Sequence, residues 1–208
     1  MKKTLLLLLI LLFPLLAAAQ DPTDPPVTKD MTTSFRLALQ VGTSKIKDAS
    51  GWGGCYEADI RYYVSRQWGL GVKYNQYSRT YSLSDFLRYY YGHYVHKVRF
   101  IGPSLSYRYQ SPQKGHSVHA SFGMGYMSSY YDRMGTTKSH SKGSTVGTFL
   151  EAGADLALCK NLSLGIAVSR YTGLVTEEET WNGKSHWTEQ TDESLKNIAL
   201  TIGLRLNL

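Results

Sequence analysis

From Ser34 onward, apolar and polar residues alternate in segment after segment of the chain. The clearest case is the last segment, where every second residue from Ile198 to Leu208 is large and apolar, with Arg205 among the residues between them. A period of two places the apolar side chains on one face of a β-strand and the polar ones on the other. The alternation predicts eight strands, at 34–42, 55–64, 68–77, 96–110, 117–128, 145–158, 162–171 and 196–208.

The predicted connections alternate in length. Those after the second, fourth and sixth strands are the short "SRQ", "SPQKG" and "CKN", whereas the others cover residues 43–52, 78–93, 132–144 and 173–193. Short turns at one end and long loops at the other are the layout of an outer-membrane barrel. A soluble sandwich also alternates, but the strands have membrane length and the polar face carries charges of both signs. We therefore expect an all-β, eight-stranded antiparallel transmembrane β-barrel with both termini in the periplasm.

The N-terminal segment predicts export. A basic "MKK", an apolar run and "AAA" up to Ala19 have the order of a cleaved signal peptide, so residues 1–19 are excluded from the fold. Residues 20–33 are rich in Pro and Thr and predict a flexible lead-in, which leaves 34–208 as the barrel domain. The predicted location is the cell outer membrane. Although the formal net charge of the 208 residues is +7, this location argues against a nucleic-acid partner.

The predicted polar face fills the barrel interior. An eight-stranded barrel is only wide enough for its own side chains, so charges on this face must meet and pair there. The predicted luminal charge network contains as many cations as anions: Arg36, Glu57, Asp59, Arg61, Lys73, Glu151, Asp155 and Arg205. A structural role, holding the barrel together, is the favoured interpretation, and a proton path, an ion path or a gate is the alternative.

The last long connection is a candidate surface-interaction loop. Its Asn-Gly pair is a strong hairpin signal and lies between strand-favouring residues, so the neighbouring strands are expected to continue as a protruding hairpin. The candidate contact residues are Trp181, Asn182, Gly183, Lys184, His186 and Trp187. This connection is acidic, whereas 79–97 is basic and aromatic. Solvated loops that touch lipopolysaccharide through Lys97 and Arg99 are the favoured interpretation, and adhesion to surface ligands, which both connections suit, is the alternative.

Taken together, these segments resemble a known family. The signal peptide, the alternating segments, "FIGPSLSYRY" (100–109) and the terminal "LTIGLRLNL" resemble the small eight-stranded outer-membrane barrels of Gram-negative bacteria, the OmpX/OmpA-like outer membrane protein beta-barrel domain superfamily, over about 34–208. The resemblance implies a signal for the barrel-insertion machinery on Leu204, Leu206 and Leu208, where Leu208 stands in place of the family's usual terminal aromatic residue. It also implies outer-membrane lipids and lipopolysaccharide as surroundings and a monomeric protein.

The residues point to no convincing catalytic or cofactor chemistry. His119, Ala120 and Ser121 match the His-x-Ser spacing of barrel enzymes that remove acyl chains from lipid A, with Glu151 as the acid, but the alternation directs His119 and Ser121 into the lumen. Histidine pairs three residues apart lack a completing ligand, so no metal or cofactor is expected.

The two cysteines lie at opposite ends of the predicted barrel. Cys55 begins the second strand and Cys159 lies in a short turn, so no disulfide between them is expected.

The expected function is therefore non-enzymatic: a structural, adhesion or surface-interaction role. The alternatives are a lipid-modifying barrel enzyme and a narrow channel for small solutes.

Overall fold

A computed structural model describes residues 34–46, 52–85, 90–111, 116–135, 139–183 and 185–208. The predicted signal peptide, the lead-in and Lys184 lie outside the described residues. The strands are β1 (Ser34–Ile46), β2 (Trp52–Tyr63), β3 (Trp68–Asp85), β4 (Tyr90–Gln110), β5 (Ser117–Gly135), β6 (Ser139–Ala157), β7 (Leu162–Trp181) and β8 (His186–Asn207). No helix that is long and apolar enough to cross a membrane occurs in these ranges.

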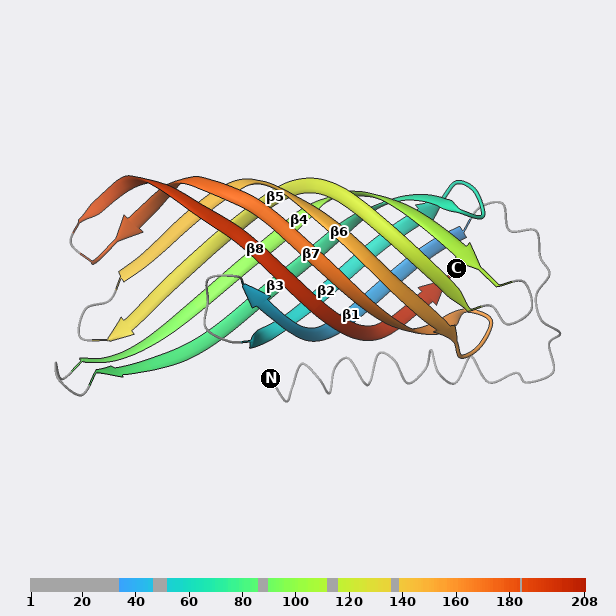
Figure 1. Ribbon diagram of the computed structural model, residues 1–208, viewed down its shortest axis with the longest axis horizontal. Helices are drawn as coiled ribbons and strands as arrows, with labels where there is room; N and C mark the ends of the chain where they lie inside the picture. Colours follow the sequence, from blue (N-terminus) through green and yellow to red (C-terminus); the bar gives the residue numbers. More distant parts are fainter. Residues whose placement is uncertain (1–33, 47–51, 86–89, 112–115, 136–138, 184) are drawn as a thin grey trace.

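The eight strands form one closed antiparallel barrel in which every strand pairs with its neighbours in the chain (Figure 1). β8 closes the ring against β1, and the backbone groups of Phe35 and Leu208 exchange two hydrogen bonds there, with N···O distances of 3.0 and 2.8 Å. Closure removes the unpaired edges that lipid does not tolerate. The prediction of an all-β eight-stranded barrel is confirmed.

The strands are strongly tilted and staggered. The pairings lead from Ala38 through Asp59 and Lys73 to Gly102, which lies against Gly125, and from Gly125 through Gly147 and Gly173 to Leu195 on β8. In the closing pairing, however, Ala38 lies opposite Arg205, ten residues further along β8. This stagger sets the tilt seen in Figure 1 and decides which residues of distant strands meet inside the barrel.

The two ends of the barrel differ in length. Short turns connect β2 to β3, β4 to β5 and β6 to β7 at the end that also holds Ser34 and Leu208, which we call the short-turn end. At the opposite hairpin end, β3 to β8 continue far beyond β1 and β2 (Figure 1). The prediction of long loops over 78–93 and 132–144 is therefore wrong: β3, β4, β5 and β6 occupy most of these residues.

The predicted hairpin between β7 and β8 is present. Both strands continue to a tight turn in which the backbone N–H of Asn182 donates to the carbonyl of Ser185 over 3.2 Å, and Gly183 has a φ of 85°. Only glycine adopts a positive φ readily, because it has no Cβ. The extensions of β3 to β6 were not predicted, because their outward face carries few large apolar residues beyond the apolar band.

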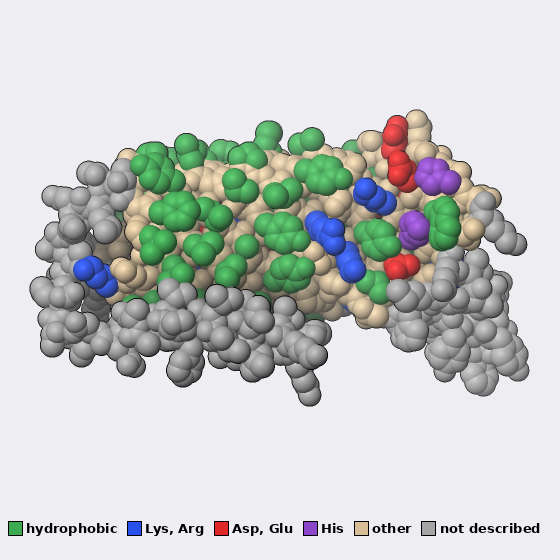
Figure 2. Space-filling model, turned by 180° about the vertical axis from the view of Figure 1, so that it is seen from behind, with side chains coloured by type: hydrophobic (Ala, Val, Ile, Leu, Met, Phe, Trp, Pro, Cys, Tyr) green, Lys and Arg blue, Asp and Glu red, His purple; other side chains and the backbone are tan. Residues whose placement is uncertain are grey.

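The outward face carries a broad apolar band. Large apolar side chains such as Val146, Leu150 and Ile202 point away from the barrel, and Val146 is 71% exposed. Arg61, by contrast, is 0% exposed inside the barrel. Figure 2 shows the apolar side chains covering the middle and the short-turn end of the molecule, while charged and histidine side chains gather at the hairpin end. This inverted arrangement is the one that a lipid environment requires.

The apolar band ends abruptly toward the hairpin end. On β3 to β6, one outward row across the sheet consists of Tyr74, Ile101, Tyr126 and Val146. The next outward row consists of Gln76, Arg99, Ser128 and Ser144. We take the boundary between these two rows as the edge of the membrane-spanning part of the barrel on β3 to β6.

Candidate functional site: the barrel interior and the hairpin end

All members of the luminal charge network lie buried inside the barrel, each with 4% or less of its surface exposed. They come from β1, β2, β3, β6 and β8. Alternation explains their direction, because each residue occupies the face opposite to the apolar band on its own strand. Their pairing depends on the stagger of the barrel, which brings together residues as far apart in the chain as Arg61 and Glu151.

Glu151 on β6 is one centre of this network. Its carboxylate accepts a bond of 2.7 Å from the Arg61 guanidinium of β2 and forms a second ion pair with Lys73 of β3. The ring Nε2 of His119 on β5 lies 3.1 Å from the same carboxylate. One carboxylate therefore links four strands.

Glu57 on β2 lies next to this centre. It pairs with Lys73 at 2.8 Å, and it accepts hydrogen bonds from the Asn75 amide over 3.0 Å and from the Tyr171 hydroxyl over 2.7 Å. Asp59 pairs with Arg61 at 2.9 Å. The anions on β2 are thus satisfied by cations and donors from β2, β3 and β7, as buried charges must be.

Asp155 is a second centre, closer to the short-turn end on β6. It pairs with Arg36 of β1 at 3.0 Å and with Arg205 of β8, and it accepts a hydrogen bond of 2.8 Å from the Ser117 hydroxyl. Arg36 and Arg205 flank the seam where β1 meets β8. The pairs at Asp155 therefore link the first and last strands through β6.

Several interior residues lie beside the predicted network although they were not among its predicted members. His119 bonds to Glu151, and the Arg108 guanidinium carbon lies 3.8 Å from the centre of the Tyr63 ring at the short-turn end. Both residues are buried, and alternation had already placed them on the polar face. Their positions in the alternation on β4 and β5, rather than any motif, could therefore have identified them as interior residues.

An apolar layer fills the interior toward the hairpin end. On β2, β3 and β6, the inward face changes from polar to apolar toward the hairpin end. The first apolar residues there are Cys55, Tyr77 and Phe149, each two positions beyond the last inward polar residue of its strand. The rings of Phe100, Phe149 and Tyr171 pack with centroid distances between 5.3 and 5.9 Å. The buried cluster comprises Cys55, Tyr77, Val98, Phe100, Met127, Phe149, Tyr171, Val175, Leu195 and Ala199. The alternation along the chain did not predict this layer.

The interior thus has two layers of opposite character. Charged pairs occupy the interior toward the short-turn end, and stacked rings with aliphatic side chains cover them toward the hairpin end. Both layers consist of buried side chains that fill the described part of the interior.

The candidate contact residues of the last hairpin do not share one face. Trp181 lies opposite His186 in the β7–β8 pairing, and Thr180 lies opposite Trp187, so the two tryptophans are on opposite faces of the hairpin. Their exposed fractions are 39% and 40%. The tip therefore presents aromatic surface in two directions.

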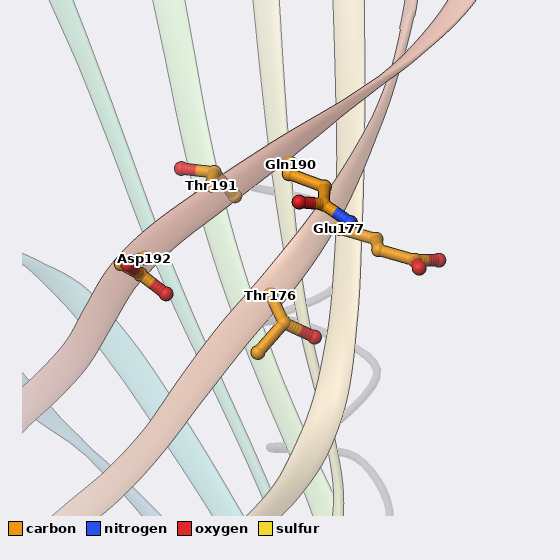
Figure 3. Close-up of a pocket in the computed structure, with 5 residues that line it drawn as sticks. All are labelled: Thr176, Glu177, Gln190, Thr191 and Asp192. Carbon is orange, nitrogen blue, oxygen red and sulfur yellow. The ribbon is translucent and has the colours of Figure 1, made fainter.

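A hollow of about 400 Å³ lies where the β7–β8 pairing shifts register between Val175 and Glu177. It is lined by Thr176, Glu177, Gln190, Thr191 and Asp192. Figure 3 shows these side chains pointing in different directions rather than toward one common point. The hollow follows from the bulge and lacks the converging polar groups of a ligand site.

The remaining predicted features also have definite places. Leu204, Leu206 and Leu208 point outward from β8 near the short-turn end, and their role as an insertion signal stays a prediction. Cys55 and Cys159 are both free thiols. In the described ranges, no group of three His, Cys, Asp or Glu residues is placed to hold a metal ion.

The two residues of the His-x-Ser match, His119 and Ser121, form contacts with different partners. The Ser121 hydroxyl donates to Ser106 over 3.1 Å and accepts a bond of 2.9 Å from Arg61. His119 instead contacts Glu151. Both residues are buried in the lumen, away from the lipid-facing surface that an acyl substrate would reach.

Comparison with solved structures identifies proteins of similar fold. Neisserial surface protein A shares 15% identity over 84% of this chain and 96% of its own, with a TM-score of 0.55. A major outer membrane protein from Thermus thermophilus shares 12% identity over 84% of this chain and 99% of its own, with a TM-score of 0.58. The outer membrane protein OprG from Pseudomonas aeruginosa shares 12% identity over 85% of this chain and 95% of its own, with a TM-score of 0.51.

These identities support a common fold and nothing more specific. No curated protein sequence matches the chain. The family model described as outer membrane protein beta-barrel domain, however, matches residues 5–207, almost the whole chain. With the closed barrel and its outward apolar band, this match shows that the chain belongs to the outer membrane protein beta-barrel domain family and is a protein of the outer membrane.

Proposed function

We propose that this protein is a monomeric, non-conducting and non-enzymatic outer-membrane barrel that carries a rigid stem for interactions at the cell surface. The barrel anchors the chain in lipid, and the extensions of β3 to β8 form the stem on the extracellular side. The observation that carries the proposal is the length of these strands beyond the apolar band.

The strand lengths set the size of the stem. β4 has 21 residues, β7 has 20 and β8 has 22, whereas about 9–11 residues of a tilted strand span a membrane. Around half of each strand therefore stands outside the lipid. Paired strands hold their shape because their backbone groups bond to each other, so the stem presents its side chains in a fixed arrangement.

The surface of the stem suits macromolecular contact. Trp181 and Trp187 are partly exposed on opposite faces of its tip, and exposed aromatic residues are frequent in binding surfaces. The exposed residues Glu177, Glu179 and Glu189 make the β7–β8 hairpin acidic on both of its faces. This combination favours adhesion to a protein or glycan surface.

Shortening the stem tests the surface role. Replacement of residues 178–189 by Asn-Gly joins β7 and β8 close to the bulge and removes both tryptophans of the hairpin. The barrel is expected to fold, as measured by heat-modifiable gel migration, and cells that display it should lose adherence to immobilised host proteins or glycans. Adherence equal to that of the wild type on every surface to which the wild type binds would sink the proposal.

Planar-bilayer recordings test the closed interior against the channel alternative. The wild-type barrel should give no steady conductance, because paired charges and stacked rings fill the lumen. A stable, ohmic channel from the purified wild-type protein would contradict this part of the proposal.

Lipid analysis tests the absence of enzymatic activity. The Ser121 hydroxyl is hydrogen-bonded to Arg61 and Ser106 inside the lumen. Ser121→Ala should therefore leave the lipid A composition of expressing cells unchanged in mass spectra. Acyl-chain removal that depends on Ser121 would favour the enzyme alternative.

A further inference from the structure

Arg108 is a buried cation at the short-turn end of the barrel interior. It lies on the inward face of β4 and is 7% exposed. Its guanidinium carbon lies 3.8 Å from the centre of the Tyr63 ring, and one terminal nitrogen donates to the Ser34 hydroxyl over 3.3 Å. The Nε of Arg108 is buried without a hydrogen-bond partner. These contacts orient the guanidinium but supply no negative charge.

The buried cations of the interior outnumber the buried carboxylates. Apart from histidines, the buried charged residues of the described chain are five cations and four carboxylates: Arg36, Arg61, Lys73, Arg108 and Arg205, and Glu57, Asp59, Glu151 and Asp155. Asp155, toward the short-turn end, pairs with Arg36 and Arg205. Among the described residues, no carboxylate forms an ion pair with Arg108. Because a buried charge without a partner is costly, we expect an anion beside Arg108.

The connections at the short-turn end add further positive charge. The sequences that join β2 to β3, β4 to β5 and β6 to β7 contain Arg66, Lys114 and Lys160 and no Asp or Glu. Cations that gather at one end of a molecule add their fields, and an acidic segment within about one Debye length, about 8 Å at physiological ionic strength, is attracted to them. The charge of this end therefore favours an acidic partner over a basic one.

The chain itself contains an acidic segment next to Arg108. Residues 20–33 directly precede Ser34 in the sequence and contain three aspartates and one lysine. The nearest of these aspartates, Asp30, is four residues from Ser34, and four extended residues span at most roughly 13–14 Å. Because the Ser34 hydroxyl contacts the Arg108 guanidinium, this length is sufficient for the Asp30 carboxylate to reach the same guanidinium.

We propose that Arg108, Tyr63 and Ser34 form a carboxylate-binding site at the short-turn end of the lumen, and that Asp30 of the same chain occupies it once the predicted signal peptide is removed. The planar guanidinium suits this role because its donors match two carboxylate oxygens at once, and the Tyr63 ring supports it from one face. With Asp30 in the site, five carboxylates balance the five cations. The site lies at the end opposite the stem and is independent of the proposed surface role.

NMR relaxation of the chain from Gln20 onward, folded in detergent micelles, tests the contact. In the wild type, the backbone amides of residues 30–33 should have order parameters close to the value of about 0.85 that is typical of rigid backbone. Asp30→Asn should lower them below about 0.6, the range of flexible segments. Asp30 precedes β1, so the barrel of this variant should fold as the wild type does, as measured by heat-modifiable gel migration. Order parameters below about 0.6 in the wild type would overturn the proposal.

Matched variants locate the two partners. Arg108→Gln should loosen residues 30–33 as much as Asp30→Asn does, and the double variant should show no further loss. Exchange of the charges, Asp30→Arg with Arg108→Glu, should restore most of the order. Asp24→Asn removes a charge from the same segment at a greater distance from Ser34 and should change nothing. Equal losses from Asp24→Asn and Asp30→Asn would show a general attraction to the short-turn end and would sink the assignment to Asp30.

Titration with acetate distinguishes the chain's own carboxylate from a free one. In Asp30→Asn the site is open, so acetate should shift the NMR signal of the Arg108 Nε–H. In the wild type, where Asp30 competes, the same shift should need at least about tenfold more acetate. Equal shifts at equal acetate concentrations would show that Asp30 does not occupy the site. If acetate shifts the signal in neither protein, Arg108 binds no carboxylate and the proposal is wrong.

Discussion

At the scale of single residues, the interior depends on a few carboxylates that each serve several cations. Glu151 contacts Arg61, Lys73 and His119, and Asp155 contacts Arg36 and Arg205. A buried charge that loses its partner cannot turn to water, so the cost of breaking such a pair exceeds the net value of the pair itself. We therefore expect these carboxylates to be the most sensitive positions of the barrel.

Glu151→Ala should lower the free energy of unfolding by about 3–5 kcal/mol, because it leaves Arg61 and Lys73 buried with fewer anions. Urea unfolding of the barrel from lipid vesicles measures the change. Glu179→Ala, which removes an exposed carboxylate of the stem, is the matched control and should stay within about 0.5 kcal/mol of the wild type. Similar values for both variants would contradict a stabilising network.

His96 gives the stem a dependence on pH. It lies on the inward face of β4 beyond the membrane-spanning part, next to Ser129 and between the Tyr77 and Tyr131 rings, and burial lowers its pKa to about 4. The folded stem holds the neutral ring, whereas an opened stem takes up a proton below its ordinary pKa of 6.5. The contribution to stability is therefore complete above pH 6.5 and is lost as the pH falls toward 4.

Proteolysis of the purified barrel across this pH range tests the expectation, with an acid-tolerant protease used throughout. Cleavage within the stem should become faster as the pH falls, and His96→Asn should flatten this trend. His186→Asn, at an exposed position, should keep the wild-type profile. An unchanged trend in the His96 variant would show that another group causes it.

At the scale of elements, each long strand passes through two environments with opposite rules. In the apolar band, large apolar residues such as Leu150 point outward and Glu151 points inward. Beyond the apolar band, Val98 of β4 points inward and its neighbour Arg99 points outward. Lipid favours apolar side chains on the outward face, and water favours polar ones there. Alternation with a period of two satisfies both, because it separates the two faces of the strand in either environment.

The turn between β7 and β8 depends on one backbone conformation. Gly183→Val should destabilise the hairpin by about 1–2 kcal/mol, because a β-branched residue is strained at a φ of 85°. Hydrogen exchange should become faster in the amides of 177–190 and remain unchanged in the membrane-spanning strands. Gly54→Ala is the control, since an added Cβ meets nothing within 4 Å there. Global loss of protection in the Gly183 variant would show that the stem and barrel unfold together.

At the scale of the whole molecule, closure makes anchor and stem one continuous sheet. β8 pairs with β1 from Asn207 to Asn197, and beyond this point β7 and β8 continue as a pair. The backbone hydrogen bonds between the membrane-spanning strands therefore restrict movement of the stem. The proposed orientation places this stem outside the cell and the short turns in the periplasm.

Protease treatment of intact cells tests this orientation. Cleavage is expected at the exposed tip of the β7–β8 hairpin, near 181–187, while the short turns at 64–67 and 158–161 stay protected. Permeabilised cells, in which the periplasm is accessible, are the control. Cleavage of the short turns alone in intact cells would reverse the topology.

The sequence predicted the fold and the direction of most side chains because both follow from local alternation. The period of two places Arg61 inward and Ile60 outward without any knowledge of neighbours. The same rule failed for strand length, since the extensions of β3 to β6 carry few large apolar residues on their outward face. It also missed the apolar layer, because Phe100 and Phe149 share the inward face of β4 and β6 with polar residues such as Ser104 and Glu151.

What the sequence by itself determined is thus the eight strands and the membrane-facing side of each. Only the tertiary structure decided which interior residues meet. The pairing of Arg61 with Glu151 and the pairing of Arg205 with Asp155 both depend on the stagger of the closed barrel. That stagger is a property of the whole ring, because every strand must pair on both sides at once, and no single segment of the chain contains it.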